Sequence, residues 1–123
     1  MKLALLADVH SNLEALGACL AHARAEGAER HAFLGDLVGY GADPEAVLDV
    51  VMAHAAAGAI VVRGNHDAAA LGYGAERMTA TAEEAIRWTQ RRLPPRHRDF
   101  LARLPLTVRD GALLFVHASA DAP

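Results

Sequence analysis

Residues 59–67 read Ala-Ile-Val-Val-Arg-Gly-Asn-His-Asp, a short apolar run that changes abruptly into polar residues. A run of small and β-branched apolar residues that ends near a glycine is typical of a buried strand. Gly64 allows a sharp turn directly after the run. Asn65, His66 and Asp67 then carry side chains that can bind metals or move protons. The stretch therefore predicts a strand over residues 59–62, followed closely by side chains that can bind metals or move protons.

Two strand-and-helix units precede this strand. Short apolar runs alternate with segments in which apolar residues recur at helical spacing. These segments are residues 2–7, 12–26, 31–34 and 44–57. Asn12 suits the N-cap of the first helix, Gly27 its end, and Pro44 the first turn of the second helix. The order β-α-β-α-β predicts an α/β fold with a parallel sheet, and residues 2–7 are expected to form a buried strand.

The second half of the chain changes to helices followed by a hairpin. Residues 79–93 and 95–104 have the apolar spacing of helices, and consecutive prolines separate them. Asp110 and Gly111 then stand between two apolar runs, which is a strong signal for a β-hairpin. The two runs are residues 106–109 and 112–116.

The bulk properties indicate one cytoplasmic domain over residues 1–123. Hydrophobic residues make up 53% of the 123 residues, which is enough for a single core. No apolar run approaches the ~18 residues that a membrane span needs. Asp8 and His10 interrupt the apolar start, so a signal peptide is not expected. Cys19 is the only cysteine, which fits a reducing compartment, and its place on the helical pattern predicts a buried side chain.

Charge and composition bear on partners and source. A net charge of −3 does not suit a general nucleic-acid binder, which is usually strongly basic. Arginines mixed with Trp88 and Phe100 in the C-terminal helices can bind nucleic acid, but their spacing favours solvated helix faces with both aromatic rings turned inward. The arginines are Arg87, Arg91, Arg92, Arg96, Arg98 and Arg103. We expect no nucleic-acid partner, and the abundance of arginine and alanine is typical of a bacterial protein.

Metal-competent side chains follow four predicted strands at the point where each strand ends. They are Asp8 and His10, Asp36, the group Asn65, His66 and Asp67, and finally His117. Ligands of parallel sheets bind beyond the carboxyl ends of the strands, so we expect these side chains to meet. Carboxylate and imidazole groups bind Mn²⁺, Fe²⁺ and Zn²⁺. Two such ions ~3.5–4 Å apart can clamp a phosphoryl group and activate a water molecule.

The ordered set Asp-x-His, Gly-Asp, Gly-Asn-His-Asp and a strand-end His resembles the signature of the calcineurin-like metallophosphoesterase superfamily. The match runs from Asp8 to His117, nearly the whole chain. The resemblance implies the N-terminal half of an α/β sandwich. It also implies hydrolysis of phosphate monoesters or diesters by a hydroxide that bridges two divalent ions, with Mn, Fe, Zn or Ni as the metal. The implied substrate is a phosphorylated small molecule or a nucleotide.

The resemblance also implies a role for each motif residue. The metal ligands would be Asp8 and His10 for the first ion, Asp36 for both ions, and Asn65 and His117 for the second. His66 would lie near the leaving-group oxygen, as a general acid or as a donor that stabilises the transition state. Asp67 would orient His66 by accepting its other ring N–H.

Two family features have no counterpart in this sequence. The late Gly-His-x-His motif, which gives one histidine to each metal, is absent because His117 is the last histidine. The second half of the family fold is also absent, so the domain is expected to be incomplete at its C-terminus. Protein phosphatases and symmetrical dinucleoside tetraphosphatases of the superfamily usually carry an arginine shortly after the bridging aspartate, whereas residues 37–41 contain none. The Gly-Tyr-Gly there is similar to small bacterial members, and protein-phosphatase activity is not expected.

The missing half also motivates a second hypothesis. The chain would then be a catalytically incomplete remnant of the same fold that binds metal or another protein. An unfinished sheet exposes an apolar edge, and such edges promote self-association into homo-oligomers.

Two further residues near the motifs are candidates for substrate binding. Arg63 directly precedes the Gly-Asn-His-Asp motif, and a guanidinium group suits a substrate phosphate. The alternative for Arg63 is a structural ion pair with Asp36 or Asp67. Tyr40 can stack on a base or leaving group, and its alternative is packing on its own loop.

Overall fold

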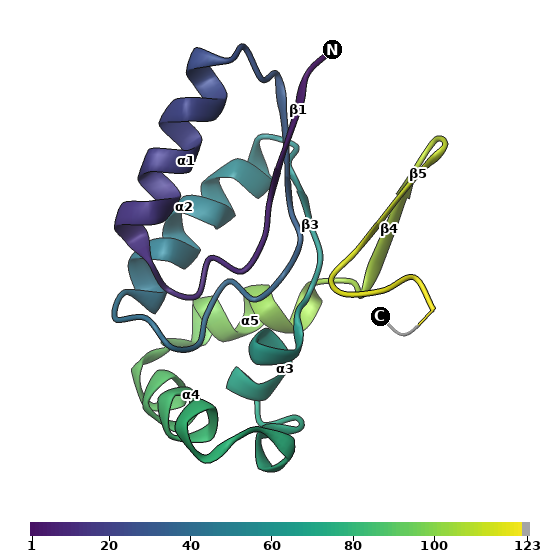
Figure 1. The fold of residues 1–123 in the computed structure, drawn as a ribbon. Helices are drawn as coiled ribbons and strands as arrows, with labels where there is room; N and C mark the ends of the chain where they lie inside the picture. Colours follow the sequence, from purple (N-terminus) through teal and green to yellow (C-terminus); the bar gives the residue numbers. More distant parts are fainter. Residues whose placement is uncertain (122–123) are drawn as a thin grey trace.

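The computed structural model describes residues 1–121, which form a three-stranded sheet, five α-helices and a β-hairpin (Figure 1). In chain order the elements are β1 (Leu3–Leu6), α1 (Leu13–Ala25), β2 (Arg30–Phe33), α2 (Pro44–Ala56), β3 (Ile60–Val61), α3 (Asn65–Ala70), the 3-10 helix η1 (Ala75–Arg77), α4 (Ala80–Arg92), α5 (Pro95–Arg103), β4 (Thr107–Asp110) and β5 (Leu113–Val116). No helix within these residues is both long and apolar enough to cross a membrane.

The sheet is parallel, with strand order β1-β2-β3, which confirms the predicted β-α-β-α-β unit and the α/β fold class. Helices α1 and α2 cover one face of the sheet, and the hairpin lies on the other side (Figure 1). Side-chain alternation in β2 explains these two layers. Phe33 packs with residues of α1 and α2, whereas its neighbour Ala32 packs with Val62 and with Phe115 of β5.

The first two helices begin and end as the sequence indicates. The side chain of Asn12 accepts the N–H of Ala15 at 3.0 Å and caps α1, and Gly27 has a φ of 79° just beyond the end of that helix. Pro44 occupies the first turn of α2. In each helix the apolar residues at helical spacing face the sheet, so burial of that face holds the helix in place.

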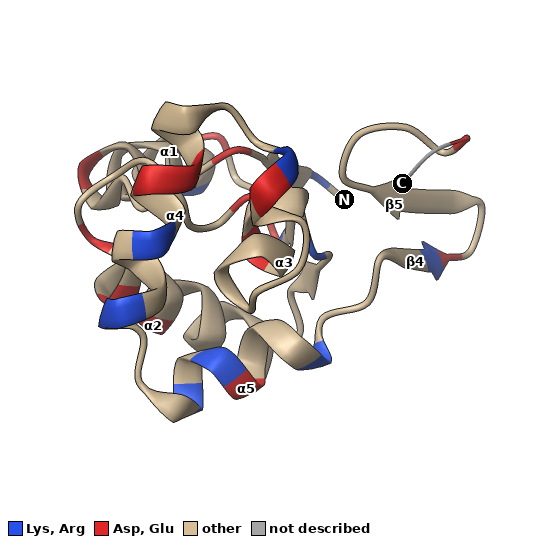
Figure 2. Cartoon of the chain, turned by 90° about the horizontal axis from the view of Figure 1, so that it is seen from below, with Lys and Arg blue, Asp and Glu red and all other residues tan. Residues whose placement is uncertain are grey.

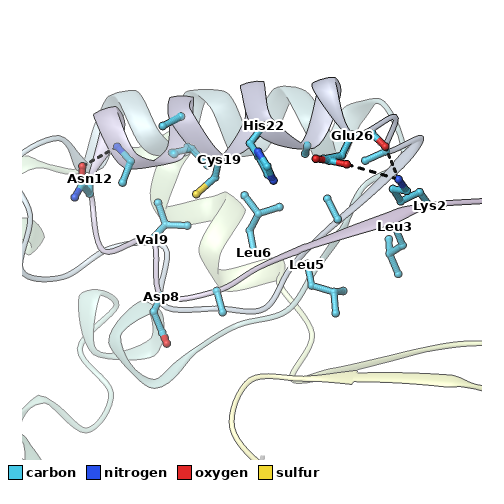
Figure 3. A pocket seen from close by; sticks show the side chains of 17 residues that line it. Lys2, Leu3, Leu5, Leu6, Asp8, Val9, Asn12, Cys19, His22 and Glu26 are labelled. Carbon is cyan, nitrogen blue, oxygen red and sulfur yellow. Dashed lines mark hydrogen bonds and ion pairs between the residues drawn. The ribbon is translucent and has the colours of Figure 1, made fainter.

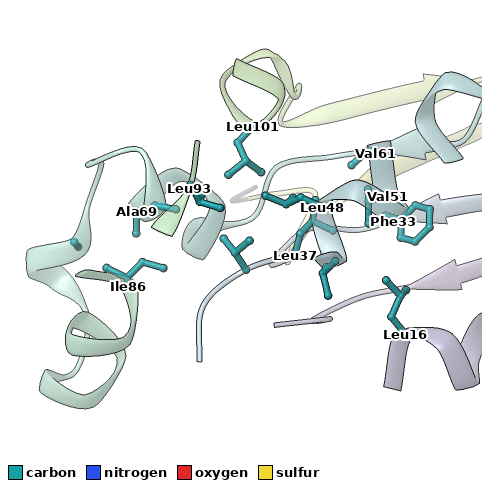
Figure 4. Close-up of a cluster of buried hydrophobic side chains, with 14 residues drawn as sticks. Leu16, Phe33, Leu37, Leu48, Val51, Val61, Ala69, Ile86, Leu93 and Leu101 are labelled. Carbon is teal, nitrogen blue, oxygen red and sulfur yellow. The ribbon is translucent and has the colours of Figure 1, made fainter. Parts of the chain in front are cut away.

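One hydrophobic core connects the sheet to the C-terminal helices (Figure 4). Val47, Leu48 and Val51 of α2 pack against the sheet, and Ile86 of α4 and Leu101 of α5 extend the same cluster. Each of these side chains is fully buried. Burying a side chain of this size contributes about 1.5–3 kcal/mol, so α4 and α5 belong to the same folding unit as the sheet.

Ion pairs cover the outer faces of α4 and α5, as predicted for solvated faces. Arg92 pairs with Glu45 of α2 at 3.1 Å, and Arg96 pairs with Asp49 at 2.8 Å. Figure 2 shows both signs of charge on the helices, not one continuous basic face. Phe100 packs on the core as expected, whereas Trp88 is only half-buried, with the guanidinium of Arg92 over its ring.

A buried histidine that the sequence analysis left without a role joins α5 to α2. His97 is almost completely buried, and its Nε2 lies 2.9 Å from Oδ1 of Asp49. The same carboxylate receives Arg96, so one acidic side chain of α2 holds two residues of α5. The contact is structural, because it lies among packed helix residues and no ligand-binding group accompanies it.

The hairpin forms where the Asp-Gly pair predicts it. Strands β4 and β5 pair antiparallel, with Asp110 opposite Leu113, and Gly111 has a φ of 61°. Asp110 also forms an ion pair with Arg30 of β2 at 2.8 Å. This ion pair and the packing of Phe115 fasten the hairpin to the sheet, and β5 thereby directs the following residue, His117, toward the ends of the parallel strands.

Two predictions about the first strand-helix unit are wrong. The strand predicted to be buried, β1, lies at the edge of the sheet, and the side chain of Leu5 is 60% exposed. Cys19, predicted to be buried, is exposed. Cys19 faces a groove of about 730 Å³ between β1 and α1, whereas the side chain of Leu5 points to the other side of the strand, away from α1 (Figure 3). Within residues 1–121 no strand pairs with the outer edge of β1. The apolar residues of β1, which the sequence pattern predicts to be buried, are therefore partly exposed to solvent.

Candidate metal centre

The structure brings the motif residues to the carboxyl end of the parallel sheet. Asp8 and His10 follow β1, Asp36 follows β2, and Asn65 opens the helix after β3. His117 reaches the same place from β5. Four separate segments therefore converge on one point. The parallel arrangement accounts for the three that follow β1, β2 and β3, whereas His117 comes from the separate antiparallel hairpin.

Asp36 is the centre of this cluster. One of its oxygens, Oδ2, lies 3.7 Å from Nε2 of His10 and 3.4 Å from Nε2 of His117. The ligand atoms form two groups of three, in each of which all atoms lie within 4.8 Å of one another. The first group is His10, Asp36 and His66, and the second is Asp8, Asp36 and His117. Asp36 is buried and belongs to both groups, which is the position that a bridging carboxylate requires.

Backbone carbonyl groups fix the tautomers of the two imidazoles nearest to Asp36. Nδ1 of His10 lies 2.9 Å from the carbonyl oxygen of Val38, and Nδ1 of His117 lies 2.8 Å from that of Leu34. A carbonyl oxygen only accepts, so each Nδ1 carries the hydrogen and donates it. Each ring thereby turns its Nε2 toward the carboxylate of Asp36. Metal-binding histidines are usually held in this way.

Asn65 completes the side of the cluster nearest His117. The oxygen of its amide lies 3.1 Å from Nε2 of His117. With the amide turned over, its nitrogen would instead donate to both oxygens of Asp36 at 3.3 Å. Either orientation places a polar atom of Asn65 between the bridging carboxylate and the second imidazole.

The expected contact between Asp67 and His66 is absent, and this part of the sequence-based interpretation is corrected. Nδ1 of His66 is buried without a hydrogen-bond partner. Asp67 instead turns away and accepts backbone N–H groups of the two loops. Its donors are Asp36 at 2.8 Å, Leu37 at 2.8 Å, Val38 at 3.2 Å and Gly64 at 2.8 Å. The contact with Gly64 is a helix-capping one, because Asp67 is the third residue of α3.

The environments of these two residues shift their pKa values. Burial raises the pKa of Asp67 to about 6, against the N–H groups that favour its ionised form, so both oxygens are acceptors at neutral pH. Burial lowers the pKa of His66, and the nearby Asp36 opposes that shift. His66 is therefore neutral at pH 7 and retains one ring N–H.

The backbone around the cluster is strained. Five residues that are not glycine have a positive φ, with values between 47° and 60°. They are Asp8, His10, Ser11, Asp36 and Tyr40. Each such residue costs on the order of 1–3 kcal/mol, and strain of this kind gathers at functional sites. All five lie at or next to the proposed ligands.

Glycines allow the loops to approach the cluster closely, as the sequence predicted. A Cβ atom on Gly64 would collide with the carboxylate of Asp36. A Cβ atom on Gly35 would lie 2.8 Å from Nδ1 of His117, and Gly35 also has a φ of 95°. Any side chain at either position would push a proposed ligand out of place.

Of the two candidate substrate-binding residues, Tyr40 lies beside the cluster, and Arg63 directly precedes Gly64 in the chain. Tyr40 is 54% exposed, and its ring centroid lies 5.0 Å from those of both His10 and His66. Arg63 is half-buried, and its Nε has no hydrogen-bond partner. Within residues 1–121 it forms no ion pair with Asp36 or Asp67, so the structural alternative for Arg63 does not hold.

The donor set fits divalent metals. The proposed ligands combine two carboxylates, two imidazoles and the amide of Asn65, with the imidazole of His66 beside them, and such groups suit hard and borderline ions. The two groups that share Asp36 fit two ions. The grouping differs from the one implied by the resemblance, because His66 lies with His10, and Asp8 lies with His117.

Comparison with known proteins agrees with this geometry. A family model described as calcineurin-like phosphoesterase matches residues 1–121. The chain belongs to the calcineurin-like phosphoesterase family. The uncharacterized protein MJ0912 of Methanocaldococcus jannaschii is 32% identical over 126 residues, covering 98% of this chain and 51% of its own length.

Solved structures of calcineurin-like phosphoesterases and their relatives share the fold. A metallophosphoesterase from Sphaerobacter thermophilus is 34% identical, with a TM-score of 0.76 over 93% of this chain and 45% of its own. The hypothetical protein PH1004 from Pyrococcus horikoshii has a TM-score of 0.76 at 23% identity, over 88% of this chain and 49% of its own, and shows the fold alone. A protein provisionally described as a diadenosine tetraphosphatase has a TM-score of 0.72 at 26% identity, over 95% of this chain and 50% of its own. The chain thus spans about half the length of these relatives.

Sequence reasoning missed two contributors to the site. The carbonyl groups of Leu34 and Val38 hold the histidine rings, and no side-chain pattern can reveal a backbone acceptor. The anchoring role of Asp67 did have a signal. An acidic residue three positions after Gly64, followed by three alanines, is the start pattern of a capped helix.

Proposed function

We propose that this chain hydrolyses phosphate esters with two divalent metal ions. The ligands are Asp8, His10, Asp36, Asn65 and His117. One observation carries the proposal: Asp36 belongs to two ligand groups, and the Nε2 atoms of His10 and His117 both face its carboxylate. When bound, the ions would activate a water molecule and stabilise negative charge on the phosphoryl group.

The metal is proposed to be Mn²⁺, Fe²⁺, Zn²⁺ or Ni²⁺. Mixed carboxylate and imidazole sets bind all four, and availability selects among them. The tautomers held by Val38 and Leu34 keep His10 and His117 ready to bind an ion without rearrangement of their rings. We also propose that the protein works in the cytoplasm, where the exposed thiol of Cys19 stays reduced.

His66 is proposed to donate its ring N–H to the leaving-group oxygen. It lies in the ligand group of His10 and Asp36, and its backbone N–H donates to Oδ1 of Asp36 at 2.9 Å. Burial keeps the ring neutral, and a neutral imidazole still offers one donor. Asp67 acts indirectly, by holding the loop of Asp36 through backbone hydrogen bonds.

The substrate is proposed to be a phosphorylated small molecule or a nucleotide, as a monoester or a diester. The family of the chain supports a phosphoester, and the similarity to a protein provisionally described as a diadenosine tetraphosphatase supports a nucleotide. Arg63 is proposed to contact a substrate phosphate, because it directly precedes the Gly-Asn-His-Asp motif and a guanidinium group suits a phosphate. Tyr40 is proposed to contact the organic part of the substrate.

The test is Mn²⁺-dependent hydrolysis of bis(p-nitrophenyl) phosphate by the purified chain. Asp36→Asn keeps the shape of the bridging residue and removes its charge, so it should lose both metal binding and turnover. Asp99→Asn is a matched control on the exposed face of α5. Metal-dependent turnover in the parent and control, lost in Asp36→Asn, supports the proposal. Equal turnover in all three proteins contradicts it.

A second function is favoured by the open edge of β1. Leu5 is exposed there, and the groove beside it is mostly lined by apolar residues. These features support a module that binds metal or protein and forms homo-oligomers without catalysis. The mass of the folded chain in solution distinguishes the two. A monomer with metal-dependent turnover supports the enzyme, and an inactive oligomer supports the module.

A further inference from the structure

A second hollow opens directly beside the metal centre, on the side of Tyr40. It has a volume of about 630 Å³ and is framed by the loop after β1, the start of α1 and the loop before α2. Asp8 and His10 are shared between the hollow and the proposed metal site. A substrate with its phosphate at the metals would therefore extend an attached group into this hollow.

Tyr40 forms an aromatic wall of the hollow and is fixed in position. Its φ is 60°, an unfavourable value for a bulky residue, and more than half of its surface is exposed. The flanking glycines let its loop approach the site closely. A Cβ atom on Gly41 would collide with the carbonyl oxygen of His10, and one on Gly39 would lie 2.6 Å from Nδ1 of His66. The backbone of Tyr40 is thus strained, and its exposed ring lies beside the imidazoles of His10 and His66, where a ligand can stack on it.

The remaining walls offer unpartnered polar groups. Ser11 is fully buried, and its hydroxyl has no hydrogen-bond partner. The carboxylate of Asp43 stands at the N-cap of α2 without capping it, and Glu14 lies in the first turn of α1. Within residues 1–121 neither acid forms an ion pair, and none of the residues around the hollow is lysine or arginine.

These charges limit what the hollow can accept. An anionic group would meet Asp8, Glu14 and Asp43, with no basic partner except the imidazole of His10. A cationic group would meet the proposed metal ions and the positive ends of α1 and α2. A neutral group with hydroxyl or amine hydrogens avoids both penalties, because ionised carboxylates are strong acceptors. A flat ring in the same group would add stacking on Tyr40.

We propose that the hollow binds the nucleoside part of a nucleotide ester, with the base against Tyr40 and the sugar or base hydrogens donated to Asp43 and Glu14. The inference rests on the proposed function, because it requires the phosphate to lie at the metal centre. It narrows the substrate to a nucleotide and assigns selectivity to residues that bind no metal.

The experiment compares two diesters with the same leaving group, p-nitrophenyl thymidine 5′-phosphate and p-nitrophenyl methyl phosphate. The thymidine ester should have a kcat/KM at least tenfold higher, since stacking of one base on an aromatic ring is commonly worth about tenfold or more. Tyr40→Leu and Asp43→Asn should each lower this ratio severalfold. Glu84→Gln, a matched change on the exposed face of α4, should leave the ratio unchanged. A parent ratio near one, or a p-nitrophenyl choline phosphate that exceeds the thymidine ester, would overturn the inference.

A binding measurement separates the hollow from the metal chemistry. Thymidine, which carries no phosphate, is titrated into the metal-free protein while backbone amide signals are followed by NMR. Signals of Ser11, Tyr40 and Asp43 should shift in the parent, and the shifts should vanish in Tyr40→Leu. NMR shifts without hydrolysis of either ester would contradict the proposed function but support the hollow as a nucleoside-binding site. Hydrolysis of both esters at equal rates without NMR shifts would support the proposed function but contradict nucleoside binding in the hollow.

Discussion

The carboxylate of Asp67 holds the backbone of Asp36: its Oδ2 accepts the N–H of Asp36 at 2.8 Å and the N–H of Gly64 at the same distance. A single buried side chain therefore joins the loop after β2 to the start of α3. Asp36 forms a second link between the two segments, because its Oδ1 accepts the N–H of His66. The position of the bridging carboxylate is set by these reciprocal contacts.

Replacing Asp67 by alanine should destabilise the protein by about 3–5 kcal/mol. The change leaves four buried N–H groups without an acceptor, and each carries a desolvation cost of about 1–3 kcal/mol that local relaxation and water entry reduce only in part. Urea denaturation followed by circular dichroism measures the effect. Asp99→Ala on exposed α5 should change stability by less than about 0.5 kcal/mol. A loss in Asp67→Ala no larger than this control would show that the anchor is unimportant.

Replacing His66 by alanine should keep metal binding and lower turnover in a way that depends on the leaving group. A donor to the leaving oxygen contributes about 10²–10⁴-fold for a poor leaving group and less for p-nitrophenolate. Calorimetric titration with Mn²⁺ checks the metal, and the kcat values for methyl and p-nitrophenyl esters check the role. His22→Ala on the exposed face of α1 is the control. Equal losses on both esters would remove the proton-donor role.

Two glycine-to-alanine changes should have opposite effects. At Gly39 the new Cβ would lie 2.6 Å from Nδ1 of His66, and the backbone has a φ of 93°, so alanine should displace His66 and lower both turnover and stability. At Gly17, inside α1, the new Cβ meets nothing within 4 Å. Alanine there should stabilise the protein by about 0.5–1 kcal/mol. Thermal unfolding and ester hydrolysis of both variants test the contrast, and similar behaviour of the pair would contradict it.

Stability should fall on acidification partly because of His31. Burial lowers the pKa of His31, and the nearby ring of His54 lowers it further. The unfolded chain then binds a proton below pH 6.5 that the folded chain does not, so this contribution is complete above pH 6.5 and decreases as the pH falls. His31→Gln should flatten the decline in urea midpoint between pH 7.5 and pH 5.5, whereas His22→Gln should not. An unchanged slope in His31→Gln would exclude this origin.

The sequence predicted the elements well where local pattern determines them. Pro44, Asn12 and the Asp110-Gly111 pair each act within a few residues of the boundary that they mark. The convergence of the motif residues that follow β1, β2 and β3 was predictable for a similar reason, since a parallel sheet places all its carboxyl ends together. The approach of His117 depends instead on how the separate hairpin docks.

The errors concern properties that a segment does not determine by itself. Whether Leu5 and Cys19 are buried depends on what packs against the edge of β1, and the pattern of apolar residues in β1 and α1 does not determine that. The positive φ of Asp36 and Tyr40 arises from tertiary contacts that override local preference. Three of the four partners of Asp67 lie about thirty residues away, beyond the reach of any local pattern, and only the contact with Gly64 is local.

The separate origin of His117 has a consequence for the order in which the site is made. The other proposed ligands lie between Asp8 and Asn65, on the β-α-β-α-β unit and the start of α3, which leave the ribosome before the hairpin. His117 arrives only with the hairpin, whose docking depends on Phe115 and on the ion pair of Asp110 with Arg30. The cluster around His10 and Asp36 can therefore form in a nascent chain before His117 is in place, and docking of the hairpin is the step that adds His117 to it.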